Sequence, residues 1–419
     1  MQVSEFLAKG FDLKFQGKLL DFCQANGLLT KEDDPTSHRF LSRSITPHIK
    51  KLSGLFNRSE TEQIAGIDAK YWKQSSNPDN LRLAYFLYYM PANLFRMASI
   101  CSELRRHGYT WPIGRKIMGV DFGSGPASAV SGFAASNFFD GDAESIRFGR
   151  WALIDQNNKM LELARKWSEF YINDNLGFEW DFATYFRKLE FKKSLLPAAA
   201  PSFNLMTFSY VLNEQSGETS DIKQIASNLV RTCENHLEED GLVIILEPAL
   251  KDQSRKVLQL RQELLKLNPS WLKILLPCFN NHDCGALSSD DWCHEQVSWW
   301  RPPYYVEIDK LAELDHKTLP FSYLVFSKTQ KQVDEILVKI KGDNPNKRFR
   351  IVSPAHKPTA RGRDVEFFAC GVKGKYRARL NSQQNIQGIE QVGRGSVLID
   401  ADITGDIHAT RVQSVRKIL

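Results

Sequence analysis

The segment "KIMGVDFGSGPAS", residues 116–128, constrains the fold of this chain more than any other stretch. It begins as an apolar run, turns at Gly123 and Gly125, and leads into "SAVSGFAAS", a stretch of small and apolar residues with helical character. Glycine permits backbone turns that other residues resist, and it lets the main chain approach a ligand closely. A strand, a glycine turn and a helix in this order predict an α/β sheet with a binding loop at its edge.

Downstream of this segment, apolar runs of strand length alternate with amphipathic stretches of helical length. The expected strands are residues 150–157, 202–214 and 241–249, and the expected helices are residues 158–172 and 254–267. Such alternation indicates a doubly wound parallel sheet. The nearly continuous apolar character of residues 241–249 fits a strand that is buried on both faces. Residues 321–329, "FSYLVFSKT", would add a strand that closes the sheet.

The regions before and after this sheet differ from it in their residue patterns. Helical patterns dominate residues 1–110, whereas short strands separated by glycine or proline turns follow from about residue 346. A chain of 419 residues is also too long for one ordinary core. We therefore expect a helical domain at 1–110, an α/β domain at 111–340 that includes a cysteine loop at 277–294, and a small β-barrel-like domain at 341–419.

The composition places the chain among globular proteins of a reducing compartment. Hydrophobic residues make up 42% of it and charged residues 25%, and no run approaches the roughly 20 apolar residues that cross a bilayer. The first residues of the chain contain no apolar segment of the kind found in signal peptides. They also include the acidic residues Glu5 and Asp12, which disfavour a transit peptide. We expect a cytoplasmic protein without a membrane partner. In that compartment clustered cysteines are metal ligands more often than disulfides.

The glycine loop differs from two common nucleotide loops. Ser128 stands at the third glycine position of the dinucleotide fingerprint, and no Gly-Lys-Ser/Thr follows as in a phosphate-binding loop. About thirty residues later Asp155 ends the second expected strand, where a carboxylate can accept hydrogen bonds from both hydroxyls of a ribose. A strand that ends in Asp-x-Gly-x-Gly-Pro, followed by a second strand that ends in Asp, resembles the S-adenosylmethionine site of class I methyltransferases.

This resemblance implies roles for several residues of the chain. Gly123, Ser124 and Gly125 would pass beneath the methionine and the ribose, and Asp155 would hold the ribose. Asp121 would orient the loop or the amino group of the ligand, and Asp181 would lie near the adenine. The implied fold is a Rossmann-like class I methyltransferase sheet.

The residues that would carry out a reaction are less evident. Many amino-methylating enzymes of this class have an Asn/Asp-Pro-Pro-Tyr/Phe motif after the fourth strand, whereas residues 208–214 here read "FSYVLNE". Tyr210, Asn213 and Glu214 are the candidates to position a substrate at this edge. Cys278 follows Pro277 as in cytosine-C5 enzymes, but its place among other cysteines disfavours a nucleophile. The sequence identifies no general base.

Three cysteines, Cys278, Cys284 and Cys293, fall within one short polar loop. Zinc and iron–sulfur sites normally use four ligands. Cys370 is the candidate for the fourth ligand, and His282 or His294 could instead complete a zinc site. The spacings differ from the paired C-x2-C knuckles of zinc ribbons. We favour a four-cysteine [4Fe–4S] cluster, with zinc as the alternative and three free thiols as the plain reading.

The segment from residue 347 to 379 is strongly basic, with ten Lys or Arg side chains against two acidic ones. Such a segment can neutralise several phosphates of a nucleic acid, and Phe349 and Tyr376 could add stacking. A solvated basic surface is the plain alternative. The candidate RNA-binding residues are Arg348, Arg350, Lys357, Arg361, Arg363, Lys375, Arg377 and Arg379.

Several of these motifs together resemble one family. The block "LEPA…LLPCFNNHDCGAL…DDWCH", the later "LPFSYLVFSKT" and "VEFFACG", and the earlier "YYMPANLFRMASICSEL" are similar to the methyltransferase-like family of mitochondrial small-ribosomal-subunit proteins and their bacterial relatives. The likeness extends from about residue 80 to 380. It implies S-adenosylmethionine, a [4Fe–4S] cluster on Cys278, Cys284, Cys293 and Cys370, and association with the small ribosomal subunit and its rRNA.

The chain also departs from the pattern of this family. Phe279 and Gly285 follow the first two loop cysteines where the family usually has proline, and Ala127 and Ala249 replace expected glycines. The leading hypothesis is an rRNA methyltransferase whose cluster links the α/β domain to a basic RNA-binding tail. The alternatives are a non-catalytic ribosome assembly factor and a zinc-stabilised RNA-binding protein. Nothing in the sequence indicates an oligomeric state.

Overall fold

A computed structural model describes residues 12–56, 78–136, 138, 146–213, 221–279, 281–354, 364–372, 374–381, 392–405 and 410–419. The chain divides into two compact units. Unit 1 comprises Met1–Glu103, Trp111–Leu246 and Val297–Leu319. Unit 2 comprises Leu104–Thr110, Glu247–Gln296 and Pro320–Leu419.

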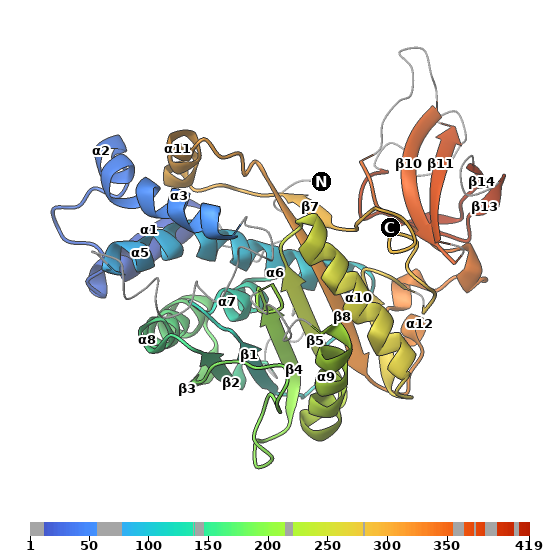
Figure 1. The fold of residues 1–419 in the computed structure, drawn as a ribbon, viewed down its shortest axis with the longest axis horizontal. Helices are drawn as coiled ribbons and strands as arrows, with labels where there is room; N and C mark the ends of the chain where they lie inside the picture. Colours follow the sequence, from blue (N-terminus) through green and yellow to red (C-terminus); the bar gives the residue numbers. More distant parts are fainter. Residues whose placement is uncertain are drawn as a thin grey trace. The chain divides into compact units, whose positions relative to one another are not determined.

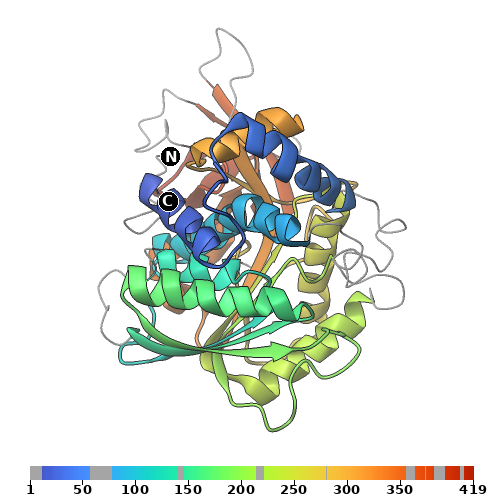
Figure 2. The same cartoon turned by 90° about the vertical axis from the view of Figure 1, so that its left-hand side faces the viewer.

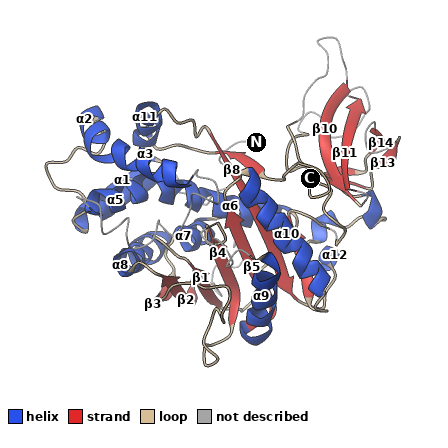
Figure 3. Ribbon diagram, in the orientation of Figure 1, coloured by secondary structure: helices blue, strands red, loops and turns tan. Residues whose placement is uncertain are grey.

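Unit 1 is built on a parallel sheet. Its strands are β1 (Ile117–Phe122), β2 (Phe148–Asp155), β3 (Glu179–Phe186), β4 (Phe203–Ser209) and β5 (Leu237–Glu247). They pair in the order β3-β2-β1-β4-β5, and the pairs β2–β3, β1–β2, β1–β4 and β4–β5 are all parallel (Figures 1 and 3). Because the order reverses between β1 and β4, the carboxyl ends of these two strands form the edge where doubly wound sheets bind their ligands.

Helices cover both faces of this sheet. Figure 2 shows α8 (Asn158–Ser168) on one face of the strands and α9 (Ile222–His236) on the other. The other helical segments of unit 1 are α1 (Leu13–Ala25), α2 (His38–Phe40), the π-helical η2 (Leu41–Ile45), α3 (Thr46–Phe56), α5 (Pro78–Ala84), the π-helical η3 (Tyr85–Tyr89), α6 (Met90–Arg106, whose last turn belongs to unit 2), α7 (Ser128–Ala135), the π-helical η5 (Glu169–Asn175) and α11 (Pro303–Ala312).

Small residues allow these layers to pack closely. A Cβ at Gly119 of β1 would lie 2.5 Å from the ring of Trp151 on β2, so the glycine leaves room for a fully buried indole. A Cβ at Gly132 of α7 would lie 2.3 Å from the carbonyl oxygen of Leu94 on α6. The small-residue pattern of α7 therefore lets it lie directly against α6, and both helices are buried along most of their length.

Unit 2 contains a helix, two antiparallel strands and a second sheet. Helix α10 (Lys251–Leu267) leads to β6 (Leu272–Leu276), which pairs antiparallel with β8 (Thr318–Lys328); β7 (Glu295–Ser298) precedes β8. The remaining helical segments are α12 (Val333–Ile336), η7 (Val338–Ile340) and η8 (Pro345–Lys347). The second sheet consists of β9 (Phe349–Ile351), β10 (Asp364–Gly371), β11 (Gly374–Asn381), β12 (Val397–Ile399), β13 (Asp402–Thr404), β14 (Thr410–Ser414) and β15 (Lys417–Ile418).

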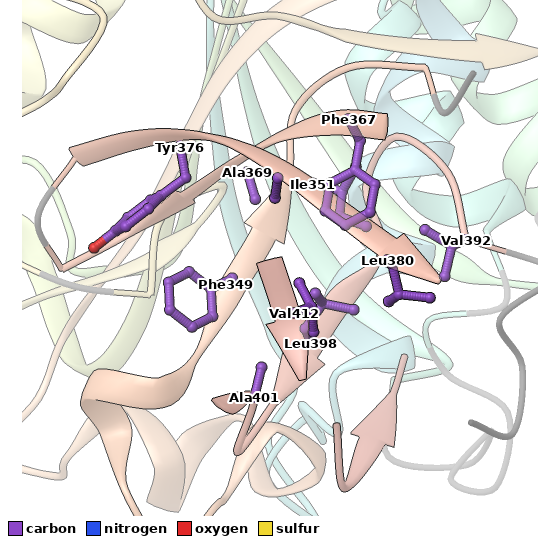
Figure 4. Close-up of a cluster of buried hydrophobic side chains, with 11 residues drawn as sticks. Phe349, Ile351, Phe367, Ala369, Tyr376, Leu380, Val392, Leu398, Ala401 and Val412 are labelled. Atoms are coloured by element: carbon purple, nitrogen blue, oxygen red, sulfur yellow. The ribbon is translucent and has the colours of Figure 1, made fainter. Parts of the chain in front are cut away.

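The second sheet has its own apolar core. Its strands follow the order β13-β14-β11-β10-β9-β12-β15. Alternate side chains of β10 and β11 point to one face, where Phe367, Ala369, Tyr376 and Leu380 pack with Phe349 and Leu398 (Figure 4). The residues between them, such as Phe368 and Arg377, therefore occupy the opposite face.

These observations confirm the predicted fold class. Unit 1 is a mixed α/β structure with a doubly wound parallel sheet and an N-terminal run of helices, and a second, curled sheet follows at the C-terminal end. The boundaries 1–110, 111–340 and 341–419 stay predictions. Within the described residues, helices of the length and apolarity needed to span a membrane are not found.

Candidate functional site

The glycine loop lies at the carboxyl edge of β1, where the sequence predicts a cofactor loop. The backbone N–H groups of Gly123 and Ser124 both donate to the carbonyl oxygen of Ile154 at the end of β2, at 2.8 and 2.9 Å. Gly123 and Gly125 have φ angles of +68° and +49°, in the left-handed region that favours glycine. Ala127, where a glycine is expected, also has a φ of +60°, so this alanine holds a conformation that costs it about 1 kcal/mol.

Asp155 fixes the shape of this loop. Its Oδ2 accepts a hydrogen bond from the N–H of Gly125 at 2.9 Å, and its Oδ1 accepts one from the N–H of Asn157 at 2.8 Å. Burial raises the pKa of the Asp155 carboxyl above its usual value, although the backbone hydrogen bonds oppose that shift. The sequence predicts a ribose contact for Asp155. The structure adds that the carboxylate first ties the end of β2 to the loop.

The neighbouring Asp121 has one oxygen without a hydrogen-bond partner among the described residues. Thr207 Oγ1 of β4 donates to Asp121 Oδ1 at 2.7 Å, while Oδ2 is buried and unsatisfied. Burial raises the pKa of Asp121 from 3.8 to about 7, the Thr207 hydrogen bond lowers it, and the nearby charge of Asp155 raises it. Ser124 Oγ and Ser209 Oγ are also buried and have no hydrogen-bond partner among the described residues.

Three unsatisfied polar atoms at one sheet edge indicate that a polar ligand belongs there, because buried polar groups in proteins nearly always have partners. A Cβ at Gly125 would meet no atom within 4 Å, so space is open on that side of the loop. These residues fit a ligand with hydroxyl and amino donors, such as S-adenosylmethionine.

The loop after β4 packs against the glycine loop. A Cβ at Gly123 would lie 2.1 Å from Val211 Cγ1, so only glycine fits there. Tyr210 has a φ of +62°, which is unusual for a bulky residue, and its N–H donates to the carbonyl oxygen of Leu246 on β5 at 2.8 Å. Strained residues of this kind cluster at functional sites. Tyr210 and Asn213 thus follow the strand beside Asp121, and Glu214 lies outside the described residues.

Asp181 is not at this edge, contrary to the expectation that it lies near an adenine. It stands at the third position of β3 and pairs in register with Arg150, whereas Asp155 pairs with Phe186. Asp181 therefore lies five residues along the strands from the level of Asp155, which corresponds to about 16 Å. Asp181 instead forms an exposed ion pair of 3.4 Å with Arg150 and lines an open cavity of about 870 Å³ at the amino edge of the sheet.

The four predicted ligand cysteines lie together in unit 2. Cys278, Cys284, Cys293 and Cys370 line one small cavity together with Pro277, Phe279, Arg348 and Arg350. The other three cysteines, Cys23, Cys101 and Cys233, are buried elsewhere. Among the described residues, no three His, Cys, Asp or Glu side chains form a group that could hold a single metal ion. Both the [4Fe–4S] cluster and its zinc alternative therefore stay predictions.

Helix α10 holds the cysteine loop in place. Arg255 Nη1 donates to the carbonyl oxygens of Ala286, Ser289 and Asp291, at 3.2, 2.9 and 2.6 Å. Two turns further along, Arg261 Nη1 donates to the carbonyl oxygen of His282 at 3.0 Å. Side-chain hydrogen bonds to backbone carbonyls fix a loop that lacks secondary structure of its own.

The same loop touches the second sheet directly. A Cβ at Gly285 would lie 2.7 Å from the backbone nitrogen of Lys375, so this glycine permits close contact with the turn that follows Cys370. Lys375 pairs with Asp291 of the loop. Arg350 Nη2 pairs with Glu295 Oε2 at 2.7 Å, and both side chains are buried. The predicted cluster would thus join segments that other contacts already hold together, rather than be their sole link.

The environment of the thiols favours their neutral form when no positive centre is bound. Burial raises the pKa of Cys293 to about 12, and the charges of the nearby Cys278 and Cys284 thiolates add to this. Burial and the other three cysteines likewise raise the pKa of Cys370 well above its ordinary value. Four thiolates in one cavity repel one another, so they need a cationic partner to ionise together.

Several predicted RNA-binding residues are not accessible. Arg348 and Arg350 are only 8% and 5% exposed, and burial lowers the pKa of Arg348. Phe349 and Tyr376, the expected stacking residues, belong to the core in Figure 4. The side chains of Arg377 and Arg379 are 58% and 43% exposed, and their RNA contacts stay a prediction. Lys357, Arg361 and Arg363 lie outside the described residues.

The sequence did not single out three residues on the open face of the second sheet. Phe368 is 37% exposed, next to Arg377 across the β10–β11 pair. Arg411 of β14 lies beside Arg379, and Glu366 is buried and pairs with both Arg377 and Arg379. Strict alternation along "VEFFACG" could have indicated this face, because one of its two adjacent phenylalanines must point away from the core.

Comparison with known proteins gives one family. The sequence profile described as mitochondrial small ribosomal subunit Rsm22 matches residues 80–392. No match is found among curated protein sequences. The chain is also similar to solved structures, three of which are PH0851, a methyltransferase homolog and the fibrillarin/Nop5p complex.

The first is PH0851, with a TM-score of 0.33 and 12% identity, covering 54% of this chain and 45% of that one. A methyltransferase homolog from Pyrococcus horikoshii gives 0.33 and 11%, covering 57% and 66%. The fibrillarin/Nop5p complex gives 0.30 and 12%, covering 56% and 82%. The chain spans less than half of the length of PH0851.

Proposed function

The chain belongs to the family described as mitochondrial small ribosomal subunit Rsm22, and we propose that it binds S-adenosylmethionine and methylates RNA of the small ribosomal subunit. The proposed binding of S-adenosylmethionine is supported by the buried, unsatisfied oxygens beside the open glycine loop, above all Asp121 Oδ2. The proposed action on RNA of the small subunit is supported by membership of the family. The cytoplasmic location stays a prediction, because the family is described as belonging to the mitochondrial small ribosomal subunit.

Each residue of the site has a part in this proposal. Asp121 Oδ2 would accept a hydrogen bond from the amino group of the methionine, and Asp155 would hold both the loop and a ribose hydroxyl. The open side of Gly125 would face the ligand. S-adenosylmethionine supplies an electrophilic methyl group when bound. Tyr210 and Asn213 would orient the nucleophilic atom of the RNA toward it, as predicted for the carboxyl end of β4.

Binding is tested by calorimetry with S-adenosylmethionine and by the variant Gly125→Ala. A methyl group there would occupy the open side of the loop, so we expect binding to weaken by at least tenfold. Gly114→Ala is the matched control, since Gly114 also has a positive φ, of +75°, and also faces open space. Equal binding by the two variants would contradict the proposed site.

Catalysis is tested with tritiated S-adenosylmethionine and small subunits from a strain that lacks the protein. We expect methyl incorporation that requires Asp155 and Gly125. A second candidate, a non-catalytic assembly factor, is favoured by the absence of a Pro-Pro motif after β4, where residues 209–213 read "SYVLN". That candidate predicts binding to small subunits without incorporation, and binding that survives Asp155→Ala.

We further propose that Cys278, Cys284, Cys293 and Cys370 hold a [4Fe–4S] cluster. Their common cavity and their mutual charge effects support this proposal. A cubane cluster binds each thiolate through a different iron, so its four sulfurs lie farther apart than the sulfurs around one zinc ion.

Anaerobic purification with iron and sulfide analysis tests the cluster. Cys370→Ser should lose the brown colour and most of the iron, whereas Cys233→Ala, at a buried cysteine of α9 outside the cavity, should keep both. Zinc in stoichiometric amount without iron would contradict the proposal and restore the zinc alternative.

A further inference from the structure

The open face of the second sheet combines an exposed aromatic ring with a row of positive charges. Phe368 of β10 is 37% exposed and lies opposite Arg377 of β11. Arg379 follows two residues after Arg377 and lies beside Arg411 of β14. Residues two apart along a strand share a face, so these four side chains form one continuous surface, called here the Phe368 face.

Two of the three arginines of this face are held in fixed positions. Glu366 is buried and accepts hydrogen bonds from both Arg377 and Arg379, while the side chains of these arginines remain 58% and 43% exposed. Lys375 Nζ lies 4.5 Å from the centroid of the Phe368 ring and is paired with Asp291. A guanidinium that uses one edge for Glu366 keeps other N–H groups for a phosphate. Such preorganisation lowers the entropy lost on binding.

The charge balance of the face favours an anionic partner. Arg377, Arg379 and Arg411 carry three positive charges, and Glu366 is the acidic residue among them; Arg411 makes no ion pair with a described residue. An exposed aromatic ring beside arginines on a sheet surface matches the combination with which proteins bind single-stranded nucleic acids, where bases stack on rings and phosphates meet cations. Bases in a duplex are already stacked on their neighbours and cannot reach such a ring.

We propose that the Phe368 face binds single-stranded RNA, with one unpaired base stacked on Phe368 and the flanking phosphates bound by Arg377, Arg379 and Arg411. This inference rests on the proposed function, in that the RNA would be an unpaired segment of small-subunit rRNA. It goes beyond the sequence prediction, because it replaces the buried Arg348 and Arg350 with Phe368 and Arg411 and it names the strandedness of the RNA.

Fluorescence anisotropy of the full-length protein tests the proposal with a ten-nucleotide single-stranded RNA and a blunt RNA duplex of equal length. The single strand should bind more tightly than the duplex. Phe368→Ala should weaken it by about 5- to 150-fold, the range found for removal of one stacking ring, whereas Phe368→Trp should retain binding. A melting curve for each variant checks that the exposed substitution leaves the fold intact.

The salt dependence tests the phosphate contacts separately. Arg377→Gln and Arg411→Gln should each reduce the slope of log K against log salt by about 0.7, the value for one lost contact to a single strand. Lys417→Gln is the matched control, because Lys417 is exposed on β15 at the far edge of the same sheet. Its binding should stay within about twofold of the wild type.

Binding to whole small subunits separates this inference from the proposed function. If the wild type and the Phe368→Ala and Arg411→Gln variants bind subunits equally well, the Phe368 face is not the RNA site, and the proposed function stands. If the wild type binds neither subunits nor RNA, the proposed function itself fails. Preference for the duplex, or equal loss with Lys417→Gln, would also overturn the inference.

Discussion

The backbone N–H of Gly125 and the carboxylate of Asp155 are joined by a 2.9 Å hydrogen bond, although thirty residues separate them. This bond ties the loop after β1 to the end of β2. The conformation of the glycine loop therefore depends on a side chain that is also the proposed ribose ligand.

Asp155→Ala should accordingly reduce both stability and cofactor binding. The N–H groups of Gly125 and Asn157 lose their acceptor, and each unsatisfied buried donor costs about 1–3 kcal/mol. We expect a lower melting temperature without ligand and at least tenfold weaker binding of S-adenosylmethionine by calorimetry. A variant that loses binding but melts like the wild type would show that the carboxylate contacts only the ligand.

Asp121→Asn should stabilise the ligand-free protein at pH 8. The pKa of Asp121 is raised from 3.8 to about 7, so between these values the folded state holds this proton more tightly than the unfolded state. Stability falls as the pH rises through that window, and the full cost, up to about 4 kcal/mol, is present above pH 7. Asparagine keeps the Thr207 hydrogen bond without a charge. Denaturant unfolding at pH 5 and pH 8 measures the effect.

The same residue gives a pH dependence to cofactor binding. An ionised Asp121 attracts the ammonium group of the methionine, so affinity should increase from pH 6 to pH 7.5 in the wild type. Asp121→Asn should bind more weakly and lack this increase, whereas Ser209→Ala should keep it. Parallel pH profiles for the wild type and Asp121→Asn would exclude Asp121 as the titrating group.

Gly285→Val should disturb the cysteine loop. A Cβ at this position would lie 2.7 Å from the backbone nitrogen of Lys375 and 3.1 Å from Gly374 Cα, and backbone atoms cannot move aside cheaply. We expect the loop to shift away from Cys370 and the iron content after anaerobic purification to fall by more than half. Gly17→Ala in α1, which meets no atom within 4 Å, is the control and should keep its iron. Full iron content in both variants would refute the expected shift.

Arg350→Met should destabilise the protein without a direct effect on RNA. It breaks the 2.7 Å ion pair with the buried Glu295, and loss of one partner of a buried pair costs about 3–5 kcal/mol. The double variant with Glu295→Leu should recover much of this loss. In contrast, Arg377→Gln should change stability by less than about 1 kcal/mol, because the Arg377 side chain is 58% exposed and Glu366 keeps its ion pair with Arg379. If Arg350→Met instead weakens RNA binding at unchanged stability, the buried ion pair is not its main role.

The sequence indicates the glycine loop and Asp155 because both signals are local. Strand, turn and helix follow one another directly, and a carboxylate at the end of the next parallel strand arrives at the same edge. Asp181 was misplaced because it depends on register. The sequence shows that a strand is present, but the pairing of Arg150 with Asp181 decides which end of the strand the residue occupies.

In the basic segment 347–379, the sequence does not show which side chains are buried and which are exposed. Which of two adjacent phenylalanines faces the core is decided by the packing of the second sheet, so Phe367 is buried and Phe368 is exposed. Likewise, Arg350 looks like any other arginine of a basic segment, and only the proximity of Glu295 on β7 shows that its charge is satisfied inside the protein. A count of charges therefore locates a basic region, but the burial of each side chain decides which of its residues can contact a partner.

The hydrogen bonds from Arg255 and Arg261 to the cysteine loop bear on whether the chain folds before or after it binds the proposed cluster. Many small metal-binding modules remain unfolded until their ion arrives. Here three backbone carbonyls are anchored to one guanidinium of α10, so contacts within the protein fix the loop independently of the proposed cluster. If the proposed cluster binds, we expect it to be loaded late, on a chain that has finished folding.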